Sequence, residues 1–131
     1  MATSRATAYF PLPVEQVWHT VTDLAHTAWR SDLFRTEIQD ETHFAEHTKS
    51  GCITNFTITA CVPPRYRAFV MEITNMSGCW EGIFETAESG TRLICTETVA
   101  ARHWWMYPFV PGYLKRQQKL YLDDLRKILL K

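Results

Sequence analysis

The sequence has no net charge, because its 14 lysine and arginine residues equal its 14 aspartate and glutamate residues. A chain without an overall field does not draw in nucleic acid or anionic membranes, so we expect no nucleic-acid partner. The sequence also lacks an apolar run of the roughly 18–20 residues that a membrane-spanning helix needs. Residues 1–9 lack the charged-then-apolar order of a signal peptide, and a cytoplasmic protein is therefore expected.

Cysteine is sparse and scattered, and no two cysteines form a C-x-x-C motif. This spacing favours free thiols over a disulfide framework or a zinc site. His43 and His47 lie on a predicted strand, where residues four apart are separated by roughly 13 Å, too far to share one metal ion. The chain also shows no phosphate-binding loop and no nucleophile elbow, and we expect neither a metal nor another cofactor.

Aromatic side chains, in contrast, are abundant: they make up 13% of the 131 residues and include five tryptophans. The length fits a single domain over residues 1–131, and a hydrophobic content of 46% excludes intrinsic disorder. A small domain so rich in rings either packs a large core or lines a pocket with them.

The N-terminal quarter predicts one strand and two short helices. The strand covers residues 4–10 and is ended by Pro11 and Pro13. Pro13 also suits the first turn of a helix, in which four apolar residues recur at helical spacing: Val14, Val17, Trp18 and Val21. A second short helix is predicted over residues 24–32, which include Trp29.

The middle of the chain predicts six strands separated by turn-forming residues: 34–40, 43–48, 52–62, 66–75, 79–86 and 91–101. Gaps this short require antiparallel neighbours. An amphipathic helix without internal glycine or proline follows over residues 113–130. Since this helix is the element able to cover one face of the sheet, we expect a curved sheet that holds the helix across an elongated cavity.

The segment from Tyr9 to Trp18 (YFPLPVEQVW), followed by Asp23 and Trp29, resembles the opening of the START-like superfamily, also called SRPBCC or helix-grip proteins. The strand Thr91-Arg92-Leu93 after a Ser-Gly turn and the long final helix are similar as well. This superfamily includes polyketide cyclases and pollen-allergen ligand binders. The resemblance implies a small single-domain member of class α+β: a curved seven-stranded antiparallel sheet wrapped around a long C-terminal helix, with two short helices after the first strand.

Strand alternation predicts which side chains face the cavity. The inward sets are Phe56, Ile58, Ala60 and Val62; Phe69, Met71 and Ile73; Trp80, Gly82 and Phe84; and Leu93, Cys95, Glu97 and Val99. With residues from the loops and the last helix, the candidate ligand-binding residues are Trp29, Phe56, Ile58, Phe69, Met71, Trp80, Phe84, Leu93, Glu97, Trp105, Phe109, Tyr113, Gln117 and Tyr121.

Glu97 is the most informative of these residues, because its parity places a carboxyl group among apolar neighbours. A buried carboxyl group is costly unless it is paired, and its pKa is often raised. It is the candidate catalytic residue, as a hydrogen-bond anchor or a general acid/base. The alternatives are a buried pair with an arginine, or a bulge that reverses the parity of the strand.

The aromatic segment 103–112 allows three interpretations. It can form a lid over the cavity, the first packing layer of the last helix, or a membrane-interface anchor supported by Arg102, Lys115, Arg116 and Lys119. We favour the lid or the packing layer, because the chain carries no second membrane signal.

Three functions remain open. The leading hypothesis is binding of a small hydrophobic or amphipathic molecule, such as a lipid, an isoprenoid or a polyketide-like compound. The second is a polyketide cyclase or dehydratase that uses Glu97 with a tyrosine or histidine. The third is a protein-interaction module of the chaperone-activator kind, which requires an exposed apolar patch. The sequence specifies neither the ligand nor the oligomeric state.

Overall fold

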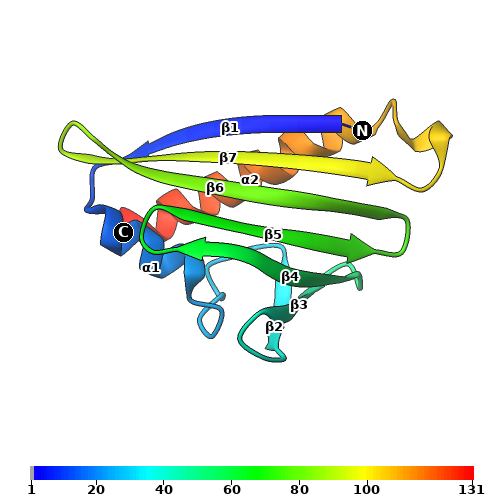
Figure 1. Ribbon diagram of the computed structural model, residues 1–131, viewed down its shortest axis with the longest axis horizontal. Helices are drawn as coiled ribbons and strands as arrows, with labels where there is room; N and C mark the ends of the chain where they lie inside the picture. Colours follow the sequence, from blue (N-terminus) through cyan, green and yellow to red (C-terminus); the bar gives the residue numbers. More distant parts are fainter. Residues whose placement is uncertain (1) are drawn as a thin grey trace.

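The computed structural model describes residues 2–131. Its strands form one seven-stranded antiparallel sheet in the order β1-β7-β6-β5-β4-β3-β2 (Figure 1). The strands are β1 (Ala2–Phe10), β2 (Leu33–Ile38), β3 (His43–Thr48), β4 (Ile53–Val62), β5 (Tyr66–Ile73), β6 (Met76–Ala87) and β7 (Gly90–Ala101). The helices are α1 (Val14–Thr22), the single 3₁₀ turn η1 (Trp104–Met106) and α2 (Val110–Leu129). The predicted meander of six strands, with the first strand added at the edge, is confirmed.

The long helix α2 crosses one face of the sheet behind β1, β7 and β6 (Figure 1). It contacts β1 and β7 directly, whereas β2 and β3 bend away from the plane of the other strands. The N-terminus lies beside the start of α2, and the C-terminus lies near α1 at the opposite end of the molecule. The helix therefore covers only part of the concave face.

The packed core lies where α1 and α2 meet the sheet. Val14, Val17 and Val21 form the buried side of α1, as the helical spacing predicts. The largest side chains of this core, each no more than 1% exposed, come from four different elements: Phe10, Phe84, Leu93 and Leu125. Burying such side chains contributes roughly 1.5–3 kcal/mol each, so this cluster is the main source of stability at this end.

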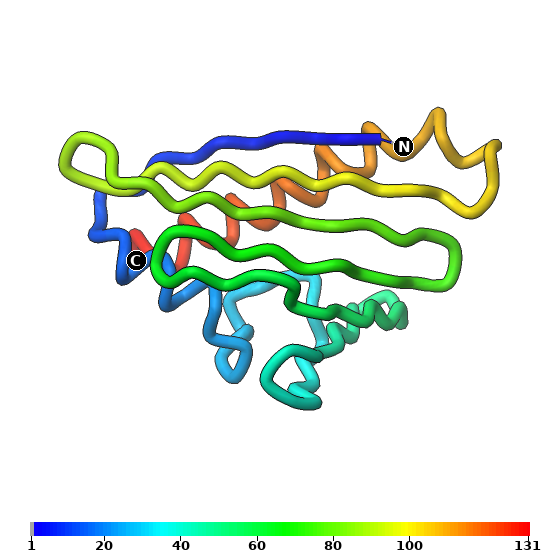
Figure 2. Tube along the Cα trace, viewed as in Figure 1, coloured from blue at the N-terminus to red at the C-terminus, as the bar shows by residue number. Residues whose placement is uncertain are grey.

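The second predicted short helix is wrong: residues 24–32 form consecutive turns instead (Figure 2). Asp23 accepts a hydrogen bond from the Ala25 amide, which turns the chain away from a helical path. At the end of the segment, the Ser31 amide and hydroxyl both donate to the buried Asp124 carboxylate of α2, at 2.8 Å each. Hydrogen bonds to side-chain carboxylates, two of them to Asp124 of the distant helix α2, therefore hold this loop.

Other boundaries differ by a few residues. The helix α2 begins at Val110, three residues before the predicted start, because Pro111 lies in its first turn, where a missing amide hydrogen costs little. A shift in the β4–β5 register between Ile58 and Ala60 ends the regular alternation of β4.

In the part of the chain that the structure describes, no helix is long and apolar enough to cross a membrane.

Candidate ligand-binding cavity

A cavity of about 170 Å³ lies between the concave face of the sheet, the 24–32 loop and α2. Its walls come from β3, β4, β5, β6 and β7 on one side and from the helix and loop on the other. Nine residues predicted from the sequence lie together here: Trp29, Phe56, Phe69, Met71, Trp80, Glu97, Tyr113, Gln117 and Tyr121.

An aromatic wall runs across four neighbouring strands, from Phe44 on β3 to Trp80 on β6. Phe44 and Phe56 stack in parallel with their centroids 4.6 Å apart, and Phe56 meets Phe69 edge to face at 5.0 Å. Phe69 then stacks on Trp80 at 4.9 Å. Cross-strand ring contacts of this kind are favourable beyond the area that they bury. They give the cavity a continuous apolar side in which the Phe44–Phe56 pair stands nearly perpendicular to the Phe69–Trp80 pair.

Gly82 allows the indole of Trp80 to lie against the sheet. A β-carbon added at Gly82 would collide with atoms Cη2 and Cζ3 of the Trp80 ring. Gly82 stands between Arg67 on β5 and Cys95 on β7 in the strand register. The missing side chain is therefore what lets the ring fold flat over its own strand instead of filling the cavity.

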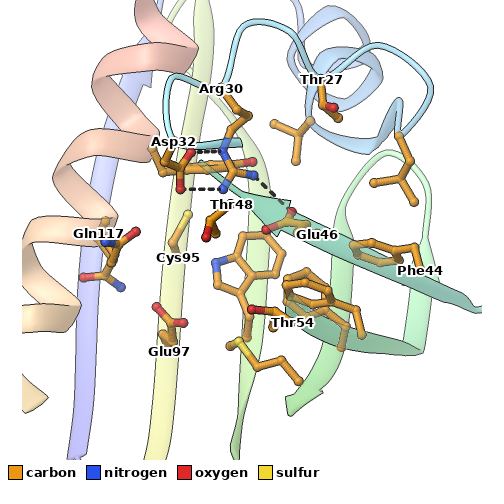
Figure 3. A pocket seen from close by; sticks show the side chains of 18 of the residues that line it. Thr27, Arg30, Asp32, Phe44, Glu46, Thr48, Thr54, Cys95, Glu97 and Gln117 are labelled. Carbon is orange, nitrogen blue, oxygen red and sulfur yellow. Dashed lines mark hydrogen bonds and ion pairs between the residues drawn. The ribbon is translucent and has the colours of Figure 1, made fainter. Parts of the chain in front are cut away.

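One end of the cavity holds a charge cluster in which Arg30 pairs with two carboxylates (Figure 3). The Arg30 guanidinium donates to both carboxylate oxygens of Asp32 at 3.3 Å and to Glu46 at 3.2 Å. Its carbon lies 5.0 Å from the centre of the Tyr121 ring. Burial alone lowers the pKa of Arg30, but the neighbouring carboxylates reverse this effect and the net shift is upward. Arg30 is therefore a satisfied structural cation.

Arg67 is buried in the same cavity without such partners. It is only 4% exposed, yet its side chain makes no hydrogen bond or ion pair with any residue in the range 2–131. Its guanidinium carbon lies 5.8 Å from the centres of both Phe44 and Phe69, which is within cation–π range. Burial lowers the pKa of Arg67. Among residues 2–131 the one fully buried side-chain polar atom without a partner is Trp29 Nε1, so the N–H groups of Arg67 are not sealed in protein but open onto the cavity.

Glu97 points into the cavity from β7, as its parity predicts, and lies opposite Trp80 in the strand register. It pairs with no arginine among residues 2–131, and β7 carries no bulge in its pairing with either neighbour. Burial raises the pKa of Glu97 to about 7, with a further contribution from the charge on Glu46. Figure 3 shows Glu97 together with Gln117 of α2 at the cavity. The carboxyl group is thus poised near neutrality.

Three polar side chains of α2 also border the cavity. Gln118 is structural: it accepts a hydrogen bond from the Ser4 hydroxyl at 2.7 Å and donates to the Ser4 carbonyl at 2.9 Å, which ties α2 to β1. Burial raises the pKa of both Tyr113 and Tyr121, which keeps these phenols protonated as donors.

Five residues predicted to line the cavity lie elsewhere. Phe84 and Leu93 face inward as expected, but they belong to the packed core beneath α1. Ile58 follows Thr57, the last residue of β4 that pairs with β3, and lies just beyond the aromatic wall. Trp105 and Phe109 are 56% and 71% exposed, so in this structure the aromatic tip around η1 does not cover the cavity. Only Val110 at the start of α2 is buried as a packing residue of this segment.

The sequence analysis did not predict every lining residue, and those that it missed include Arg30, Asp32, Phe44, Glu46 and Arg67. Arg67 shares the strand parity of Phe69 and Met71, so alternation alone could have identified it. Phe44 and Glu46 alternate on a strand that was correctly predicted. Arg30 and Asp32 come from a loop, where no periodic signal exists.

Metal-ligating side chains do not gather in the cavity. Among residues 2–131, no three His, Cys, Asp or Glu side chains form a group that could hold a metal ion. His43 and His47 lie on strand β3, as predicted, and each bonds a different carboxylate: Asp40 at 2.9 Å and Glu37 at 3.2 Å. The four cysteines are free thiols, and Cys95 is the buried one.

Solved structures with the same architecture are numerous. A START superfamily protein from Mycobacterium smegmatis superposes with a TM-score of 0.87 at 9% identity, covering 97% of this chain and 96% of that chain. A conserved protein from Geobacillus kaustophilus gives 0.83 at 12% identity, covering 98% and 95%. DynU16, from the dynemicin biosynthetic locus, gives 0.77 at 16% identity, covering 98% of this chain and 47% of its own. At these identities the likeness shows the helix-grip fold and no more.

Comparison with curated proteins gives no match. Residues 1–129, however, match the protein family described as polyketide cyclase / dehydrase and lipid transport. This match spans almost the whole chain and agrees with the helix-grip fold and its internal cavity. The chain therefore belongs to the polyketide cyclase / dehydrase and lipid transport family.

Proposed function

We propose that this protein binds a small amphipathic molecule in the cavity between the sheet and α2. The observation that carries the proposal is the composition of the cavity: beside a continuous aromatic wall lie the buried Arg67 and the half-buried Glu97, whose side chains have no partner within residues 2–131. Apolar walls with a few polar groups that fix orientation are typical of ligand sites. The wall supplies affinity, and the polar groups supply orientation.

The cavity volume limits the size of the molecule. An engineered apolar cavity of about 150 Å³ in another protein holds one benzene molecule. The present cavity, about 170 Å³, is similar in size. We therefore infer a ligand, or a buried ligand portion, of about one ring, which excludes a fully enclosed long acyl chain. A lipid or an isoprenoid would bind only through a short head portion.

The first test combines native mass spectrometry with a titration. The mass of gently purified protein, compared with its denatured mass, reports a co-purified ligand directly. Titration with p-cresol, a one-ring amphipathic probe, is followed through the indole N–H resonances of Trp29 and Trp80, each assigned by substitution with phenylalanine. We expect saturable shifts of both resonances, because both side chains line the cavity.

Matched variants on β5 distinguish the cavity from the surface. Phe69→Trp adds volume to the cavity wall and should abolish the p-cresol shifts. Val70→Trp adds the same ring one residue away, at a position that is 41% exposed and outside the cavity, and should leave them unchanged. The absence of both a bound mass and a saturable shift in the wild-type protein would overturn the proposal.

One observation favours a second candidate function, acid/base catalysis on a small polyketide-like chain. Glu97 lies in the cavity with a pKa raised to about 7 by burial, which suits a group that both donates and accepts protons near neutrality. The protonated phenols of Tyr113 and Tyr121 border the same space. A cyclase or dehydratase would use these groups on a substrate carbonyl.

Glu97→Gln separates catalysis from binding. Glutamine keeps the size and the hydrogen-bond donor of the protonated acid but transfers no proton. Incubation with a short poly-β-keto N-acetylcysteamine thioester, followed by mass spectrometry of the products, should show cyclisation or water loss in the wild-type protein only. Equal, uncatalysed rates in both proteins would leave binding as the function.

A further inference from the structure

We propose that the natural ligand carries a carboxylate that binds Arg67, so that the molecule is a one-ring aromatic or similarly flat acid. This inference rests on the proposed binding function and names the chemical class of its ligand. It begins with Arg67, whose side chain has no hydrogen-bond or ion-pair partner among the cavity residues.

The cavity contains two buried arginines with opposite environments. Arg30 is held by Asp32 and Glu46 through three hydrogen bonds. Arg67 has no carboxylate within ion-pair distance among residues 2–131, although it is the more deeply buried residue. Leaving a guanidinium in apolar surroundings without an acceptor is unfavourable. An acceptor brought by the ligand removes this penalty.

The position of Arg67 also determines what kind of acceptor fits. Phe44 and Phe69 lie 5.8 Å from the guanidinium carbon and hold it through its charge, which leaves its N–H groups free. Five N–H donors in a planar fork match the two oxygens of a carboxylate. The aromatic wall beside this fork offers apolar ring surface to the body of the same ligand.

The other carboxyl groups of the cavity do not compete for this place. Asp32 and Glu46 are engaged by Arg30. Glu97 lies on β7, opposite Trp80 and two strands away from Arg67 on β5. At pH 6, below its raised pKa of about 7, Glu97 is mostly protonated and does not repel an anion. The free positive charge of the cavity is therefore located at Arg67.

The test compares two probes that differ in charge but hardly in shape, benzoate and benzamide. Each is titrated at pH 6 into protein with ¹⁵N-labelled tryptophan, and the Trp29 and Trp80 indole resonances report binding. We expect benzoate to bind roughly tenfold to a hundredfold more tightly than benzamide, since hydrogen bonds to charged groups are the stronger ones. Equal affinity of the two probes in the wild-type protein overturns the inference, whatever the variants do.

Two variants test whether Arg67 is the residue that causes the preference for benzoate over benzamide. Arg67→Met keeps an apolar chain of similar length and should reduce the benzoate-to-benzamide ratio to about one, while benzamide still binds. Arg65→Met removes an exposed arginine two residues away and should leave the ratio unchanged. A preference that survives Arg67→Met contradicts the assignment. Binding of p-cresol and benzamide without any preference for benzoate would refute the carboxylate but leave the proposed function intact, whereas binding of none of the three probes, together with the absence of a co-purified ligand mass, would refute both.

Discussion

The two halves of the concave sheet face have similar inward sequences but opposite packing. Beneath α1 and the end of α2, Phe10, Phe84, Leu93 and Leu125 are fully buried and fill the space. Across β3, β4 and β5, the rings of the aromatic wall stand beside an open cavity. The difference lies in what covers them, because α2 packs on β1 and β7 and leaves the bent part of the sheet uncovered.

This comparison shows that an aromatic residue on the inner face of the sheet can belong either to the packed core or to a ligand site. Which of the two it becomes depends on whether a helix packs directly against it. Trp80 and Phe84 are four residues apart on the same face of β6, yet Phe84 packs edge to face against Trp18 of α1 whereas Trp80 lines the cavity. Strand alternation assigns the face of the sheet. The distance to the covering helix decides whether that face is filled.

The largest expected effect comes from truncating one ring in each half. Phe84→Ala should reduce the free energy of unfolding by about 3–5 kcal/mol, as is usual for a fully buried phenylalanine. Phe69→Ala should cost about 2 kcal/mol or less, because one side of this ring already borders empty space and loses few contacts. Urea denaturation of both variants checks this, and equal losses would contradict the division into filled and hollow halves.

The next largest difference in stability is expected between variants of the two arginines of the cavity, Arg30 and Arg67. Arg30→Met leaves Asp32 and Glu46 without their cation and should reduce stability by about 3 kcal/mol. Arg67→Met removes an unpaired charge and should leave stability unchanged or raise it by about 1 kcal/mol. The same urea experiment measures both changes. A similar loss in the two variants would show that Arg67 has a structural partner.

The pH dependence of stability tests the burial of Glu97. Its pKa is raised from 4.5 in the free side chain to about 7 in the folded protein, so the folded state binds the proton more tightly than the unfolded state. Its contribution to stability is therefore full below about pH 4.5 and is lost as the pH rises through 7. The slope reaches at most about 1.4 kcal/mol per pH unit.

Glu97→Gln is the control for this effect, because glutamine does not titrate. The difference in unfolding free energy between the variant and the wild-type protein should move in favour of the variant between pH 5 and about pH 8. Urea midpoints measured across this range give that difference directly. A difference that does not vary with pH would place Glu97 in contact with solvent.

The smallest expected effect concerns the floor of the cavity. Gly82→Ala should change stability by no more than about 1 kcal/mol, since the atoms it meets belong to the end of the Trp80 side chain, but it should push the indole into the cavity. Weaker p-cresol binding and an altered Trp80 resonance would report this shift. Gly112→Ala on α2, where the nearest atom lies 3.8 Å away, should raise stability by about 0.5–1 kcal/mol without affecting binding.

Much of the site could be predicted from the sequence, and the residues and elements that could not be predicted share a physical cause. Regular alternation on β5, β6 and β7 correctly placed Phe69, Trp80 and Glu97 on the inner face. Ile58 keeps the same alternation and pairs with Phe69 in the register in which Phe56 pairs with Met71, but it follows the last β4 residue that pairs with β3 and does not line the cavity. Residues 24–32 form a loop and not the predicted helix, because their path is determined by hydrogen bonds that Asp23 and Asp124 of α2 accept from the amides of Ala25 and Ser31.

The sequence by itself determined the order of strands and helices and the inward face of most strands, since turn-forming residues and period-two alternation act over a few neighbouring positions. Only the tertiary structure decided that Arg30 is paired and Arg67 is not, that Phe84 fills the core while Trp80 borders a cavity, and that Trp105 and Phe109 are exposed. These outcomes depend on where the sheet bends and where α2 lies on it. Both are set by contacts between residues far apart in the chain, which no local pattern encodes.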